Sequence, residues 1–266
     1  RCTKIKFPKI GSMLKTIKLH SCHSIKTLEF LQIPNLHLDH LEVNNCSNIS
    51  EISGIKNCKS IVVQDCSSIQ KIHSLSKIGS ITIDKCPELM YINHLTKTKY
   101  CSISRCDNIN VLYRVQVLTS MLVEYCPKLD AIDHIISPEL IVRYCSRLAR
   151  LYVNKKTTQL FLEECSMLDY IKFDPESKKK LVATKLSIVL KGIFAFSSIS
   201  AWNAISLTII DNPNLLKIDT VYDLKSLSVH SCSNIYSIKN MIIESAIDIS
   251  DCSSLEEIDN IMGPET

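Results

Sequence analysis

Apolar residues recur along almost the whole chain, and their arrangement repeats with a period of about 20 residues. Each repeat opens with apolar residues two positions apart, as at Leu41 and Val43 or at Ile81 and Ile83. This alternation is typical of a short strand with one buried face. We therefore predict one short strand near the start of each repeat.

The second half of each repeat has a different spacing. Apolar residues there lie three positions apart, as at Ile49 and Ile52, and many repeats add a third, such as Ile55. A spacing of three suits 3-10 or extended turns, and too few residues remain for a full α-helix. Each unit is therefore expected to contain one strand, a tight corner and an irregular return.

A cysteine follows each predicted strand and marks the repeat. Most successive markers keep the same interval, whereas the step from Cys22 to Cys46 is longer and the step from Cys126 to Cys145 is slightly shorter. A nearly fixed period indicates a repeat architecture. Cys2 precedes the predicted ladder, which consists of Cys22, Cys46, Cys66, Cys86, Cys106, Cys126, Cys145, Cys165, Asn212 in place of a cysteine, Cys232 and Cys252.

No single unit can bury its apolar side, so we predict that the units stack into a solenoid with a parallel sheet and a core of Ile and Leu rows. One solenoid of about 13 units is expected over residues 1–266, with an irregular insertion near 172–204. Within it we expect an exposed charged loop at Asp174 to Lys180 and a degenerate unit with Lys191 at the marker position. A functional loop and a tolerated loop without a role remain open alternatives.

The unit L-x-L-x-x-C-x-x-L-x-x-I resembles the leucine-rich repeat, L-x-L-x-x-N/C-x-L. It is seen as LEVNNCSNISEI from Leu41, as ITIDKCPELMYI from Ile81, and as LTIIDNPNLLKI from Leu207, where Asn replaces Cys in register. Its short length is similar to that of helix-poor bacterial and protist members. The resemblance implies an α/β-class repeat solenoid, strand-dominated and helix-poor. It further implies a weakly curved arc with one parallel β-sheet face, irregular or 3-10 returns, and partner binding through the sheet.

The 13 cysteines raise the question of disulfides or metal. Side chains of adjacent parallel strands point alike, which is unfavourable for the torsion of about 90° in a disulfide. The closest pair is Cys101 and Cys106, and no C-x-x-C spacing is present, so we predict no metal site. We expect buried free thiols that contact a backbone carbonyl of the turn, which favours a reducing, cytoplasmic compartment.

Composition excludes several function classes. The net charge of +4, from 31 basic and 27 acidic residues, gives no single-sign field of the kind that binds nucleic acid. No apolar run is long enough to span a membrane, and no nucleophile motif or phosphate loop is present. We expect solvated histidines, no cofactor, no metal and no enzymatic activity. Solvated carboxylates are expected at the outward positions Asp84, Glu124, Glu163, Glu164 and Asp251.

The outward strand positions form a candidate binding surface. They are polar in the early and late units, whereas the middle units carry aromatic and apolar residues next to charges. Exposed aromatics surrounded by charge are typical of interaction hot spots. That such residues merely suit a sheet remains an alternative. The predicted surface for a protein or peptide partner comprises Tyr100, Leu122, Glu124, Tyr125, Ile141, Arg143, Tyr144, Phe161 and Glu163.

We therefore predict an interaction or ligand-recognition module that binds a macromolecular partner on its sheet face. One alternative is the recognition arm of a larger enzyme or receptor whose catalytic or signalling domain lies outside this sequence. Another is a polysaccharide-active parallel β-helix. We also expect the sequence to be part of a longer chain, with flanking domains or subunits covering the solenoid ends, because terminal repeats need shielding.

Overall fold

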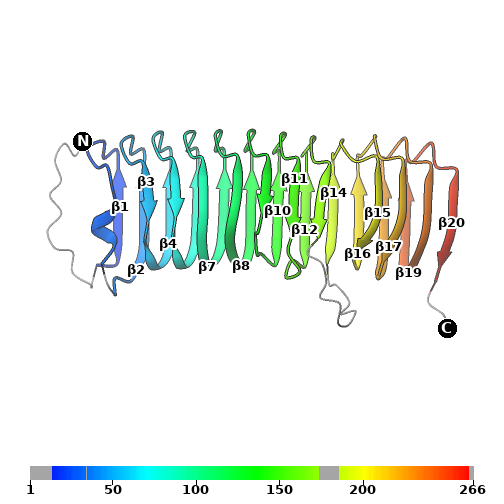
Figure 1. The fold of residues 1–266 in the computed structure, drawn as a ribbon, viewed down its shortest axis with the longest axis horizontal. Helices are drawn as coiled ribbons and strands as arrows, with labels where there is room; N and C mark the ends of the chain where they lie inside the picture. The colour runs from blue at the N-terminus through cyan, green and yellow to red at the C-terminus, as the bar shows by residue number, and fades with distance from the viewer. Residues whose placement is uncertain (1–13, 34, 174–185, 264–266) are drawn as a thin grey trace. The chain divides into compact units, whose positions relative to one another are not determined.

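The computed structural model describes residues 14–33, 35–173 and 186–263 (Figure 1). The chain forms two compact units, unit 1 (residues 1–138) and unit 2 (residues 139–266). Each unit is a parallel β-solenoid in which successive coils stack strand on strand. The predicted strand-dominated, helix-poor solenoid is thus confirmed, and the two units are described one at a time.

A coil has a front strand, which ends just before the marker position, and, except in the first described coil, a return strand that follows the marker. Both kinds pair in parallel with their counterparts in the next coil. In unit 1 the longer strands β7 and β8 run from a return segment into the next front segment. The described elements of unit 1 are β1 (Thr16–His20), η1 (Glu29–Leu31), β2 (Leu38–Asn44), β3 (Glu51–Ser53), β4 (Lys56–Gln64), β5 (Lys71–His73), β6 (Ser76–Asp84), β7 (Tyr91–Ser104), β8 (Val111–Glu124) and β9 (Ala131–Asp133).

The pairing in unit 1 follows the sequence repeat. Leu41 of β2 lies opposite Ile61 of β4, which lies opposite Ile81 of β6, so one coil corresponds to one repeat. The first step is longer, because Ile17 of β1 pairs with Leu41. The 3-10 turn η1 lies within this longer coil and takes up part of the additional chain.

Unit 2 continues the same architecture with less regular spacing. The front strands β10 and β12 pair at the regular interval, whereas β12 and β14 are separated by a longer stretch of chain. The predicted loop Asp174 to Lys180 falls in this longer stretch and lies outside the described residues. The described strands of unit 2 are β10 (Glu139–Arg143), β11 (Arg150–Val153), β12 (Gln159–Glu163), β13 (Tyr170–Phe173), β14 (Ser187–Lys191), β15 (Ser198–Asn203), β16 (Ser206–Ile210), β17 (Lys217–Tyr222), β18 (Leu224–His230), β19 (Ser237–Ser250) and β20 (Glu257–Met262).

The expected placement of Lys191 at the marker position is wrong. Lys191 pairs with Glu163, which stands two residues before the marker Cys165, so Lys191 is an outward residue of β14. The marker position of this coil is Ile193, which is fully buried. The inward residues of β14 are Ile188 and Leu190. A lysine at the buried marker position would lose the hydration of its ammonium group without gaining an ionic partner.

The core consists of the residues that carry the repeat pattern. Inward strand residues such as Leu41 and Val63 have no exposed surface, and the same holds for Ile49 and Ile52 of the return. The returns contain more strand than the spacing of three suggested, because Ile52 pairs in parallel with Ile72 of the next coil. Backbone pairing with the neighbouring coil satisfies the polar groups of a segment too short for a helix. None of the described helical segments is long and apolar enough to cross a membrane.

The corner between strand and marker has a left-handed backbone. The residue directly before each marker has a φ of 50° to 63°, as at Asp65, Lys85 and Glu164, and glycine occupies this corner only at Gly192 among the described coils. In most described coils the amide of the corner residue donates to the strand end of the next coil, for example from Asp65 to the carbonyl of Asp84 (3.1 Å). These coil-to-coil hydrogen bonds offset the cost of about 1 kcal/mol for a left-handed non-glycine residue.

The marker thiols line the inside of this corner. None of the twelve described cysteines forms a disulfide, and every one except the half-buried Cys252 is buried. Each marker thiol contacts the carbonyl two residues earlier, as from Cys66 to Gln64 (3.1 Å) and from Cys145 to Arg143 (3.3 Å). Asn212 fills the same place, because its side chain accepts from the Ile193 amide and donates to the Leu190 carbonyl (3.3 Å). Cys2 lies outside the described residues.

One core position carries an unsatisfied polar group. Thr98 of β7 is fully buried, and its hydroxyl has no hydrogen-bond partner. We expect Thr98→Val to raise the free energy of unfolding by about 1 kcal/mol, because valine has the same shape without the buried hydroxyl. Urea denaturation followed by circular dichroism measures this change. Thr98→Ser keeps the hydroxyl, so an equal gain for both variants would contradict the explanation.

Candidate binding surface

The structure separates the predicted surface residues of unit 1. Tyr100 lies opposite Ser120, at the start of the front segment of β8. Tyr125 lies in the left-handed corner just after the end of that segment. The five strand residues between Tyr100's neighbour Ser120 and this corner span about 16 Å. Leu122 and Glu124 pair with Ser102 and Ser104. Tyr100 and Tyr125 are about half exposed, but they lie at opposite ends of the front strand and form no common patch.

The predicted residues of unit 2 do come together. Ile141 of β10 pairs with Phe161 of β12, which pairs with Val189 of β14. These three half-buried side chains form an apolar row across three front strands. In the next coil the row continues with Thr208, so the apolar part ends there.

A row of charges lies beside the apolar row. Arg143 pairs with Glu163, and Glu163 pairs with Lys191 in the following coil. The Glu163 carboxylate accepts from the Lys191 ammonium at 2.8 Å, and the Nε atom of Arg143 lies 3.5 Å from its other oxygen. The hydrogen bond to Glu163 holds the pKa of Lys191 above its ordinary value. The guanidinium carbon of Arg143 lies 4.8 Å from the centre of the Phe161 ring, a cation–π contact.

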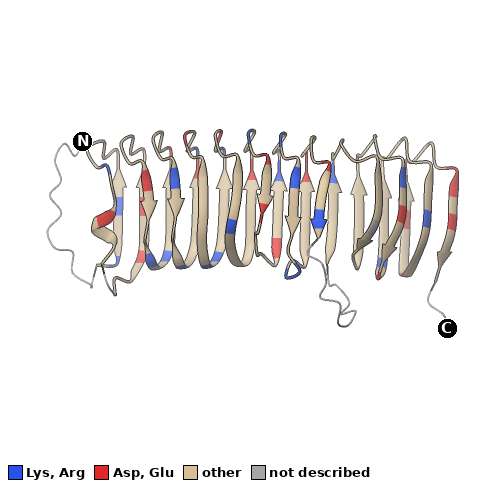
Figure 2. Cartoon of the chain, viewed as in Figure 1, with Lys and Arg blue, Asp and Glu red and all other residues tan. Residues whose placement is uncertain are grey.

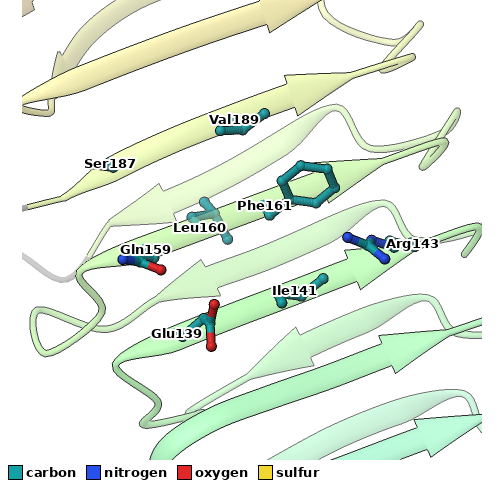
Figure 3. A pocket seen from close by; sticks show the side chains of 8 residues that line it. All are labelled: Glu139, Ile141, Arg143, Gln159, Leu160, Phe161, Ser187 and Val189. Atoms are coloured by element: carbon teal, nitrogen blue, oxygen red, sulfur yellow. The ribbon is translucent and has the colours of Figure 1, made fainter.

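The apolar row, together with Arg143 of the charged row, lines a shallow groove of about 300 Å³, referred to below as the Phe161 groove. Figure 3 shows Phe161 between Ile141 and Val189, with Arg143 toward the carboxyl ends of the strands and Glu139 toward their amino ends. The lining residues are Glu139, Ile141, Arg143, Gln159, Leu160, Phe161, Ser187 and Val189. A groove of this size, apolar in the middle and charged at both ends, can take one large apolar side chain with a polar neighbour.

The sequence pattern predicts part of this groove and misses the rest. It selects Ile141, Arg143, Phe161 and the adjacent Glu163, and also Tyr144 in the neighbouring corner. Val189 is absent from the predicted surface, because a marker at Lys191 confines the predicted strand to Leu186 to Ile188. The signal that could have corrected the phase is the alternation of Ile188 and Leu190, which continues the inward pattern.

Both signs of charge are interspersed over each unit (Figure 2). The expected solvation of the outward carboxylates is wrong for Asp84 and Glu163, which are 9% and 8% exposed. Arg105 and Ser104 donate hydrogen bonds of 2.7 Å to Asp84. Burial by itself raises the pKa of Asp84, but these hydrogen bonds outweigh it, so that its pKa lies below the ordinary value. Close stacking of neighbouring coils encloses such side chains on an outward face.

The described histidines and acids do not form a metal centre. No group of three or more His, Cys, Asp or Glu side chains among the described residues has an arrangement that could hold a metal ion. The nearest approach is Glu42, whose carboxylate lies 3.1 Å from His20 and 3.4 Å from His40. Lys18 also lies 3.5 Å from this carboxylate, so Glu42 is the centre of a surface ion-pair cluster.

Comparison with known proteins gives no family for this chain. No family model matches it, and neither a curated protein nor a solved structure shows significant similarity. The resemblance to the leucine-rich repeat therefore stays a prediction from the repeat motif, whereas the parallel solenoid rests on the structure.

Proposed function

We propose that this protein is a recognition module that binds a protein or peptide through the front sheet of unit 2, with the Phe161 groove as the main contact. The observation that carries this proposal is the apolar row Ile141, Phe161 and Val189 at outward positions of a sheet. In the two following coils the same row is polar, with Thr208 and Ser228. An apolar row with a charged rim is the usual composition of a protein-binding site.

The chemistry of the front carboxylates also favours binding over catalysis. A glycosidase needs two carboxyl groups on opposite sides of the substrate bond, one of them able to donate a proton. Glu163 is instead held by Lys191 and Arg143, and Asp84 by Arg105. The lowered pKa of Asp84 makes this group a poor proton donor near neutral pH. These pairings support a stabilising role for both acids.

A display library of random short peptides, selected against the chain, tests the proposal. We expect enriched peptides with at least one large apolar residue, measured afterwards as synthetic peptides by fluorescence anisotropy. Phe161→Ala should weaken their binding at least about tenfold, because it removes the aromatic floor of the groove. Circular dichroism should remain unchanged, since Phe161 is an outward residue of β12.

Tyr222 provides the matched control. It is an exposed aromatic residue of the same unit, at the end of the return strand β17. Tyr222→Ala should leave the affinity of the selected peptides within about twofold. Tyr222 does not line the groove, and residues outside a hot spot contribute little to the binding energy. Selected peptides that bind Phe161→Ala as tightly as the unchanged chain would overturn the proposal, as would loss of binding in Tyr222→Ala alone.

A further inference from the structure

The Phe161 groove has a direction, because its two ends differ in charge. Glu139 and Arg143 stand four residues apart on β10, at opposite ends of the groove. Four strand residues span about 13 Å, so a short peptide segment can reach both ends. Gln159 and Ser187 are the neutral polar neighbours of Glu139 in the next two coils. The amino end of the groove is therefore acidic, and the carboxyl end carries the guanidinium.

Arg143 is only partly engaged by its acidic neighbour. Glu163 gives its short contact to Lys191 (2.8 Å), and the Arg143 Nε atom, at 3.5 Å, makes no hydrogen bond although it is buried. Two cations thus share one carboxylate in this row. The side chain of Arg143 is still 37% exposed, so an incoming group can reach its guanidinium.

Two further acids, Glu164 and Asp211, lie on the side of Lys191. The carboxylate of Glu164 lies next to Gly192, because a Cβ added at Gly192 would lie 2.5 Å from it. The charge of Asp211 helps to raise the pKa of Lys191. The corner residue that directly follows Arg143 is Tyr144, which carries no carboxyl group and is partly exposed. An anion is therefore best accommodated at Arg143, next to Phe161.

We infer that the partner presents a carboxylate beside a large apolar side chain: the side chain enters the groove between Ile141, Phe161 and Val189, and the carboxylate pairs with Arg143. Arginine binds a carboxylate through two parallel hydrogen bonds, which fixes orientation as well as affinity. Glu139 stands at the opposite end of the groove, away from this carboxylate. This inference rests on the proposed function and names the class of peptide that the groove selects.

Two peptides that differ only in charge test the inference: acetyl-Gly-Phe-Asp-Gly-amide and acetyl-Gly-Phe-Asn-Gly-amide. Titration into nitrogen-15-labelled protein, followed by amide chemical shifts, should place the perturbed residues on β10, β12 and β14. We expect the Asp peptide to bind about fivefold more tightly than the Asn peptide at low salt, with a smaller ratio at high salt. Arg143→Gln should reduce the ratio to about one.

Arg147 supplies the control for charge alone. It is exposed in the turn after the marker Cys145 and does not line the groove, so Arg147→Gln should keep the fivefold ratio. Equal affinity of the two peptides, with both lost in Phe161→Ala, would overturn the carboxylate inference and leave the proposed function standing. Absence of shifts with either peptide at millimolar concentration would also overturn this inference, and the display selection, which assumes no charge, would then decide the proposed function separately.

Discussion

Raising the pH from 8 to 10 is expected to remove about 4 kcal/mol of folding free energy from each unit and to unfold the chain cooperatively. The cause is the set of buried thiols. Burial raises the pKa of Cys101 to about 12 and those of Cys165 and Cys232 to about 11. The hydrogen bond with Cys106, together with burial, raises the pKa of Cys86 to about 12.

The sign follows from proton binding. A thiol in the unfolded chain titrates near pH 8.5, whereas these four stay protonated in the folded chain up to about pH 11. Between those limits the folded state binds more protons, so stability is complete below about pH 8 and falls as the pH rises. By pH 10 each of these thiols lowers the free energy of unfolding by about 2 kcal/mol. Each unit holds two of the four thiols. Natural domains are stable by only about 5–15 kcal/mol.

Circular dichroism between pH 7 and 11, in the presence of a reducing agent, measures this transition. Trp202, the single tryptophan, reports on unit 2 by fluorescence. Cys101→Val is the matched variant, because the same inward position holds Ile81 and Met121 in the neighbouring coils. Between pH 9 and 10 this variant should lose about 1 kcal/mol less than the unchanged chain. Constant stability from pH 8 to pH 10.5 would contradict the explanation.

The second large effect is expected at Gly79, where Gly79→Ala should destabilise unit 1 by about 3 kcal/mol. A Cβ at this position would lie 2.3 Å from the backbone oxygen of Lys59 and 3.1 Å from its carbonyl carbon. The backbone cannot move away easily, because Cys58 and Ser60 are paired with Ile78 and Ser80 on either side. Urea denaturation followed by circular dichroism measures the loss.

Lys99 gives the control for this substitution. It stands one full repeat after Gly79, at the same place in the next coil, and there the structure already accommodates a side chain. Lys99→Ala should therefore change the stability by no more than about 0.5 kcal/mol. A loss in Gly79→Ala no greater than that in Lys99→Ala would show that the coils separate locally to admit the methyl group.

The groove shows how far sequence reasoning reaches for a binding site. Phe161 and Ile141 are recognisable because one regular repeat step places them side by side. Val189 belongs to the same row, but it follows Phe161 at a longer interval, across a region without a cysteine marker. For Tyr100 and Tyr125 the pattern predicts outward side chains, and the strand register together with the left-handed corner shows that they stand at opposite ends of a strand.

The sequence by itself determined the repeat, the inward rows and the free thiol ladder, because every coil presents the same local environment and the pattern of Ile, Leu and Cys is repeated many times. The tertiary structure alone decided two features: the left-handed corners, and the burial of Asp84 and Glu163. Each depends on which residue of the next coil stacks above a given position. Apolar spacing within one coil carries no information about that contact, since it follows from the hydrogen-bond register between coils.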